Sequence, residues 1–197
     1  MRAIAVQENI KDVILDAADR LLARYGYKKM TIDDLAQEVG IGKGTVYLHF
    51  RSKEEIVLSH VDRIVERVLE PLNTIAQSDA PPAAKIREML ITRVMFRFDA
   101  VQHYTESISE VLRDLRPALL ERRERSFALE AEAIAGVLKE GQRARAFRRR
   151  DPEETARALV VATNALLPFS LSTRELGKRK DVDQAVQRIA DLLVNGL

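Results

Sequence analysis

The stretch from residue 31 to residue 53, TIDDLAQEVGIGKGTVYLHFRSK, decides how this chain folds. Thr31 is a favourable N-cap, and Asp34 stands at the position of a capping-box acid, so a short helix is expected to begin here. Gly40 follows the last apolar residue of that helix, where a helix commonly ends in a left-handed glycine. A second short helix follows directly. Two short helices joined by a glycine-bearing turn form a helix-turn-helix.

The second helix is expected from Lys43 to Phe50. Val46 and Phe50 lie four residues apart and face the partner helix, which leaves hydrogen-bond donors on the other faces. Residues 40 to 53 hold three cations and no Asp or Glu. A short helix with donors and a positive local charge suits a major groove that is lined by phosphates.

The run from Gly40 to Ile56, GIGKGTVYLHFRSKEEI, closely resembles the DNA-binding signature of TetR-family transcriptional regulators. The resemblance implies that Lys43, Thr45 and Tyr47 face the groove and that Lys43 reads guanine O6 and N7. It also implies that Gly44 allows a close approach to the DNA. The positions that match phosphate-holding residues of the family are Thr31, Tyr47, His49 and Lys53. Structural roles stay open for these four: an N-cap, a core tyrosine, a packing histidine and a surface lysine.

The whole chain reads as all-α, in about nine helices, with no competing strand signal. Residues 1–50 are expected to form the DNA-binding domain, and residues 51–197 a larger ligand-binding and dimerisation bundle. The helical patterns and their caps predict helices at 9–26, 31–39, 43–50, 52–71, 82–103, 105–115, 117–141, 151–173 and 181–193. Asn9 is expected to cap the first helix and Asp151 the eighth, and Pro71 is expected to end or bend the fourth.

Composition agrees with a soluble, cytoplasmic regulator. The net charge of +2 is too small for indiscriminate nucleic-acid coating, so DNA contact must come from a local patch. The chain has no cysteine and its first residues lack an apolar signal core. The longest uncharged run, residues 158–173, is shorter than a membrane-spanning helix requires.

That uncharged run predicts a homodimer. A helix that is apolar on all sides must be covered by its own core and by a second surface, and a symmetry mate supplies that surface most simply. The TetR resemblance implies the same dimer, formed by the final two helices. The expected interface residues are Leu159, Ala162, Thr163, Leu166, Leu167, Ser170, Val186, Ile189 and Leu193.

The resemblance also implies a small-molecule effector, apolar or amphipathic, bound in the larger bundle and relieving repression of a palindromic operator. Polar and aromatic side chains beside apolar helical stretches are the pocket candidates: Arg93, Phe96, His103, Tyr104, Phe127 and Asn164. The arginine-rich run from 143 to 150 is expected to be a solvated loop.

An enzymatic function is not expected, and neither is a cofactor or a metal. The glycines at 40, 42 and 44 follow no strand and fail the Walker spacing, and nucleophile-elbow and zinc-protease motifs are absent. The three histidines have no metal-binding spacing. Two other functions remain possible: a regulator controlled by a partner protein, and a helical protein-binding scaffold that does not bind DNA.

Overall fold

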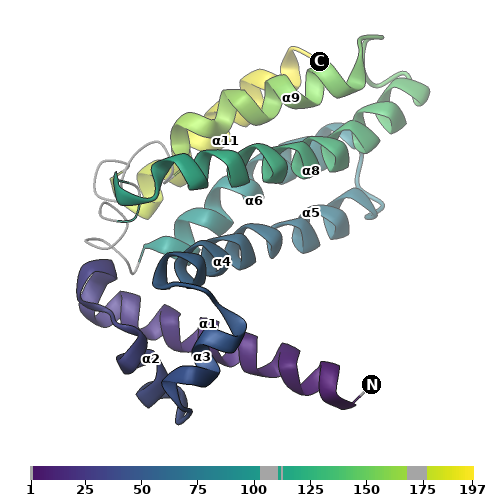
Figure 1. The fold of residues 1–197 in the computed structure, drawn as a ribbon. Helices are drawn as coiled ribbons and strands as arrows, with labels where there is room; N and C mark the ends of the chain where they lie inside the picture. Colours follow the sequence, from purple (N-terminus) through teal and green to yellow (C-terminus); the bar gives the residue numbers. More distant parts are fainter. Residues whose placement is uncertain (1, 103–110, 112, 168–176) are drawn as a thin grey trace. The chain divides into compact units, whose positions relative to one another are not determined.

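The computed structural model describes residues 2–102, 111, 113–167 and 177–197, and for residues 2–9 it describes only the backbone. The described residues form α-helices and one short 3-10 helix and contain no strand, which confirms the all-α prediction (Figure 1). The helices are α1 (Arg2–Lys29), α2 (Ile32–Val39), α3 (Lys43–His49), α4 (Lys53–Glu66), α5 (Leu69–Ala76), α6 (Pro82–Val101), α8 (Arg116–Arg143), α9 (Pro152–Thr163), the 3-10 helix (Asn164–Leu166) and α11 (Arg179–Asn195).

The chain divides into two compact units. Unit 1 comprises residues 1–63 and 103–119, and unit 2 comprises residues 64–102 and 120–197. The helix α4 contributes residues to both units, because it runs from Lys53 to Glu66. The predicted helix at 105–115 falls largely outside the described residues.

In unit 1, α1, α2 and α3 pack around a common apolar core. Ile14, Met30, Leu35 and Val46 are completely buried. The regular part of α1 ends at Gly26, whose φ of 79° is left-handed and is therefore accessible mainly to glycine. The predicted helix stop at this glycine is confirmed.

The prediction that Asn9 caps the first helix was wrong. The α-helix begins at Arg2, so the backbone at Asn9 is inside it. Residues 2–8 (RAIAVQE) are mostly good helix formers, and their propensity continues the helix past a residue that could have capped it.

The break predicted at Pro71 lies slightly earlier in the chain. The helix α4 ends at Glu66 and α5 begins at Leu69, so Pro71 occupies the first turn of α5, where its missing N–H leaves no helical bond unmade. Pro117 likewise stands in the first turn of α8.

In unit 2, α6 packs against α5, α9 and α11. Ile86, Met89, Leu90 and Val94 of α6 are completely buried, and Ile134 and Leu138 of α8 belong to the same core. Helices α9 and α11 lie side by side in Figure 1, and they contact each other.

The predicted helix over 151–173 is shorter than expected. Asp151 caps it by accepting a hydrogen bond from the Glu154 N–H at 2.8 Å, as predicted, but α9 ends at Thr163. The Arg93 guanidinium donates to the Val160 carbonyl and to Thr163 Oγ1, which satisfies polar groups in the last turn. A side chain from another helix therefore binds the C-terminal end of α9.

Among the described residues, every helix is too short or too polar to span a bilayer, and no group of three or more His, Cys, Asp or Glu side chains is placed to hold a metal ion.

Candidate functional site

The turn between α2 and α3 is built by caps that the sequence predicts. Thr31 Oγ1 accepts a hydrogen bond from the Asp34 N–H at 3.1 Å, and the Asp34 carboxylate accepts from the Thr31 N–H at 3.0 Å. Gly40 has a left-handed φ of 76° and its N–H donates back to Ala36 and Gln37. The capping box and the left-handed C-cap are both confirmed.

Two buried side chains attach α3 to unit 1. Val46 is completely buried, and Phe50, which caps the helix through its N–H, is 5% exposed. The opposite face of the helix is open, because Tyr47 is 49% exposed and Leu48 is 83% exposed. No described residue forms a hydrogen bond with the Tyr47 hydroxyl, so that hydroxyl can donate to a ligand.

Gly44 and Thr45 lie at the start of α3, and the partly buried His49 lies at its end. A Cβ built on Gly44 would have nothing within 4 Å, so the protein's own packing does not require a glycine there. A close approach by an external surface is a function that this glycine can serve.

Lys43 is held by an acid that lies ten residues earlier in the chain. Its Nζ donates to Asp33 Oδ2 at 2.8 Å, and both side chains are exposed. This hydrogen bond raises the pKa of Lys43. The ammonium keeps two further donors, and an exposed pair contributes little to stability, so Lys43 can still turn toward DNA.

Lys53 bridges the start of α4 and the end of α1. Its Nζ donates to the Tyr27 carbonyl at 3.0 Å and lies 4.5 Å from the centre of the Tyr27 ring. The Tyr27 hydroxyl in turn donates to Glu54 Oε1 at 3.2 Å. Lys53 therefore has a structural role in addition to the phosphate contact that the resemblance implies.

The Tyr27 hydroxyl is expected to ionise only at high pH, so the stability of the protein should depend on pH in the alkaline range. Burial, followed by the charge of Glu54, raises the pKa of Tyr27 from 10.0 to about 12. The folded state therefore favours the protonated phenol, and this contribution to stability is complete below pH 10 and is lost as the pH rises toward 12. We expect Tyr27→Phe to remove the last step of the phenolate absorbance titration. An unchanged titration curve would contradict this assignment.

Sequence reasoning missed two residues of this surface. A count of charges along residues 40–53 does not include Asp33. The helix-turn-helix nevertheless brings the Asp33 carboxylate, which belongs to α2, into contact with Lys43. Leu48 is apolar, so a rule that admits only polar side chains as DNA contacts leaves it out. An exposed leucine beside donors can contact the methyl group of thymine, and its position between Tyr47 and His49 was the available signal.

Three of the effector candidates lie together in unit 2. Arg93 Nη2 donates to Asn164 Oδ1 at 3.2 Å, and its guanidinium carbon lies 5.4 Å from the centre of the Phe127 ring. Phe96 is partly buried and packs against the core of this unit. His103 and Tyr104 lie outside the described residues.

Arg93 belongs to a completely buried charge network. Its Nε donates to Glu130 Oε2 at 2.7 Å, and Arg97 donates to both oxygens of the same carboxylate. Side chains of all three residues are at most 2% exposed. The network holds two cations and one anion, and Arg97 Nε has no hydrogen-bond partner among the described residues.

The predicted dimer residues fall into three groups within one protomer. Leu159, Thr163, Leu167 and Val186 are buried in the core of their own unit. Leu166, Ile189 and Leu193 are partly buried, Ala162 is exposed, and Ser170 lies outside the described residues. The exposed large apolar side chains of these two helices are Val161 of α9, 65% exposed, and Leu192 of α11, 75% exposed.

Comparison with known proteins agrees with this geometry. A family model described as bacterial regulatory proteins, tetR family, matches residues 14–59. A helix-turn-helix transcriptional regulator from the lacX 3' region of Lactococcus lactis subsp. lactis is 37% identical over 83 residues. That match covers 42% of each chain, so this chain aligns with less than half of that relative's length.

Two further comparisons extend over nearly the whole chain. The fatty acid metabolism regulator protein of Bacillus subtilis (strain 168) is 24% identical over 192 residues, which covers 93% of each chain. The solved structure of the regulator FadR from Bacillus subtilis in complex with stearoyl-CoA has the same fold, with a TM-score of 0.68 at 18% identity over 94% of this chain and 98% of that one. The capped helix-turn-helix, the family model and these relatives lead to one conclusion: residues 14–59 form a helix-turn-helix region of the tetR family of bacterial regulatory proteins, in a chain that has the fold of these regulators.

Proposed function

We propose that this protein is a repressor that binds a palindromic operator as a homodimer and leaves it when a small molecule binds unit 2. The observation that carries the proposal is the open face of α3. Tyr47 is half exposed with an unused hydroxyl, Lys43 is exposed, and the protein's own packing leaves Gly44 open. A helix held from behind by Val46 and Phe50 can enter a major groove with this face.

A dimer would present two copies of α3 to one side of the duplex. For two half-sites, this requires the helices to be about 34–36 Å apart. The support for a dimer is the apolar face of Val161 and Leu192, flanked by the exposed Ala158, Ala162 and Ala165. Two such faces can cover each other in a four-helix interface. Light scattering at micromolar concentration should give twice the chain mass, and a monomer would contradict the proposal.

The effector we propose is a long-chain fatty acyl thioester. Two relatives support this class, since one is a fatty acid metabolism regulator and another was solved with stearoyl-CoA. In this chain, the cluster of Arg93, Phe127 and Asn164 combines an aromatic wall with buried polar groups, as effector sites commonly do. The effector must bind more tightly to the protein in its DNA-free conformation, because only a difference in affinity shifts the equilibrium.

The effector proposal is tested on the protein–DNA complex. Stearoyl-CoA should release the DNA in a mobility-shift experiment, whereas coenzyme A without the acyl chain should leave it bound. Release by neither compound, or by both equally, would contradict the acyl-chain assignment.

The DNA-binding proposal is tested by selecting duplexes from a random-sequence library with the wild-type protein. We expect an enriched motif with twofold symmetry. Lys43→Ala should reduce the discrimination between that motif and a scrambled duplex by about tenfold to a hundredfold, because a bidentate guanine contact is lost. Lys11→Ala is the matched control, since Lys11 is exposed on α1. No enrichment, or equal losses in both variants, would contradict the proposal.

Asp33→Asn should strengthen DNA binding. The substitution removes a carboxylate from the DNA-facing surface and frees Lys43 from its 2.8 Å partner. We expect about threefold to tenfold tighter binding at low salt and a steeper dependence on salt concentration. Glu38→Gln on the same helix removes an equal charge that pairs with Arg20 instead. A similar gain in both variants would mean that the effect is one of net charge alone.

A further inference from the structure

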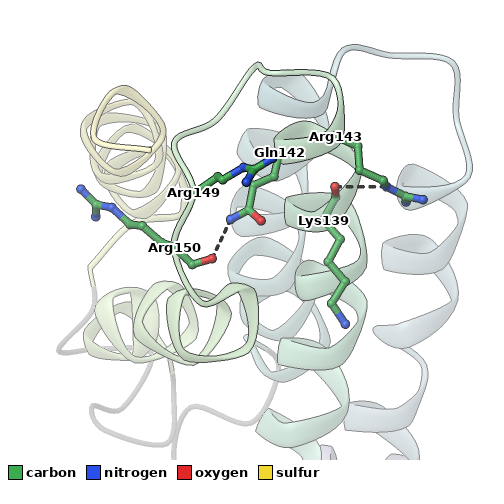
Figure 2. A pocket seen from close by; sticks show the side chains of 5 residues that line it. All are labelled: Lys139, Gln142, Arg143, Arg149 and Arg150. Atoms are coloured by element: carbon green, nitrogen blue, oxygen red, sulfur yellow. Dashed lines mark hydrogen bonds between the residues drawn. The ribbon is translucent and has the colours of Figure 1, made fainter.

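A pocket of about 620 Å³ lies at the end of α8 in unit 2, remote in sequence from the helix-turn-helix. Its lining consists of Lys139, Gln142, Arg143, Arg149 and Arg150. All five side chains carry hydrogen-bond donors, and none of these lining residues has a carboxylate (Figure 2). The volume is within the range of small-molecule sites, about 300–1,000 Å³.

The charge around this pocket is unusually one-sided. Residues 139–150, KEGQRARAFRRR, hold six cations and one carboxylate, whereas the whole chain has a net charge of only +2. The one carboxylate, Glu140, is bound by Lys85 at 3.0 Å, and Lys139 pairs with Glu153 at 2.6 Å. The five arginines between 143 and 150 form no ion pair within the described part of the chain.

The arginine-bearing loop is held in place by contacts that the sequence did not predict. The Gln142 amide donates to the carbonyls of Arg148, at 3.3 Å, and Arg150, at 2.8 Å. The Arg148 N–H donates to the carbonyl of Leu197 at 3.0 Å. Phe147, 8% exposed, anchors the loop in the core of unit 2. The loop was expected to be merely solvated, but its backbone is fixed on both sides of Arg149.

Helix electrostatics explain only part of the cluster. Arg143 stands in the last turn of α8 and its Nε donates to the Lys139 carbonyl at 3.3 Å, a favourable position for a cation at a helix C-terminus. Arg149 lies beyond the end of α8, so the charge at the helix C-terminus does not account for its position. Figure 2 shows Arg149 reaching toward Gln142, whereas the Arg150 guanidinium points away from the other four side chains.

The structure assigns to this pocket a small ligand that bears at least two phosphate charges, bound by Lys139, Arg143 and Arg149. Phosphate oxygens are acceptors only, and they match the cationic donors of Lys139, Arg143 and Arg149. Lys139 and Arg143 project from the end of α8 and Arg149 from the loop that Gln142 holds, so one pocket brings the three cations together, and this favours a small anion over the backbone of a DNA duplex. This site does not depend on the proposed operator binding.

The test is titration calorimetry of the full chain at physiological ionic strength with three probes: inorganic triphosphate, ADP and coenzyme A. We expect at least one to bind, and Arg143→Ala/Arg149→Ala to weaken that binding by about tenfold or more, as loss of charge-assisted hydrogen bonds predicts. The matched control is Arg125→Ala/Arg157→Ala, which removes two exposed arginines of unit 2 that do not line the pocket.

The three probes separate the possible sources of the phosphate. Equal affinity for all three identifies a site for phosphate groups alone, and preference for ADP or coenzyme A identifies a nucleotide site; both support the proposal. Three results would overturn it. The first is no binding of any probe, and the second is equal weakening of binding in the two double variants. The third is that binding of a short random-sequence DNA duplex depends on Arg143 and Arg149 more strongly than binding of the probes does. The last result would make the cluster a second DNA contact.

Discussion

Glu130→Gln is expected to lower the free energy of unfolding by about 3–5 kcal/mol, the largest single effect that the structure predicts. Glu130 is completely buried and is the only carboxylate paired with Arg93 and Arg97 among the described residues. Glutamine keeps the shape but removes the charge, so two guanidinium groups remain in the interior of unit 2 without an anion. Chemical denaturation of the variant and the wild type measures the difference.

The control for this prediction is Glu132→Gln, two residues further along α8 on its exposed side. It should change stability by less than about 0.5 kcal/mol, as surface substitutions usually do. Replacing all three charged residues by apolar ones, as Arg93→Met/Arg97→Met/Glu130→Leu, should recover much of the loss, because the desolvation cost of the ions disappears. Equal stability of Glu130→Gln and wild type would show that the network is not buried as described.

Gly141→Ala is expected to destabilise the protein by about 1–3 kcal/mol, the usual cost of forcing extra atoms into a packed site. A Cβ at Gly141 would overlap the ring of Phe147, which is anchored in the core of unit 2. Because that ring also holds the arginine-bearing loop, the variant should bind triphosphate less tightly than the wild type. Thermal unfolding and calorimetry measure the two effects.

Gly136→Ala is the matched control in the same helix. A Cβ at Gly136 would have nothing within 4 Å, so helix propensity alone should act, and a gain of about 0.5–1 kcal/mol is expected. A loss in both variants would show that α8 tolerates no side chain at either glycine for some other reason. A gain of stability in both variants would show that the Phe147 ring does not lie against Gly141.

Local rules predicted much of this molecule correctly. The capping box of Thr31 and Asp34, the left-handed Gly40 and the Asp151 N-cap are contacts between residues three or four positions apart, so their geometry follows from the chain itself. The same rule failed at Asn9, where several favourable helix formers outweighed one favourable cap. Element type was therefore more predictable than element ends.

Contacts between distant segments could not be predicted in this way. Helical periodicity placed Arg93 and Asn164 beside apolar stretches, but it could not show that Glu130 neutralises Arg93 or that Arg93 helps to end α9. It also could not show that Asp33 holds Lys43, because that pair depends on the angle between two helices.

The amino-acid sequence by itself determined that this chain is helical, that α2 and α3 form a helix-turn-helix, and that this region resembles the TetR regulators, because these depend on short-range patterns of capping, periodicity and motif. Only the tertiary structure decided which charges are buried together, which face of α9 is open, and that Arg149, on a loop held by Gln142, lines a pocket with Lys139 and Arg143. These features arise where residues far apart in the chain meet, and their energies depend on burial and distance, which a linear pattern does not contain.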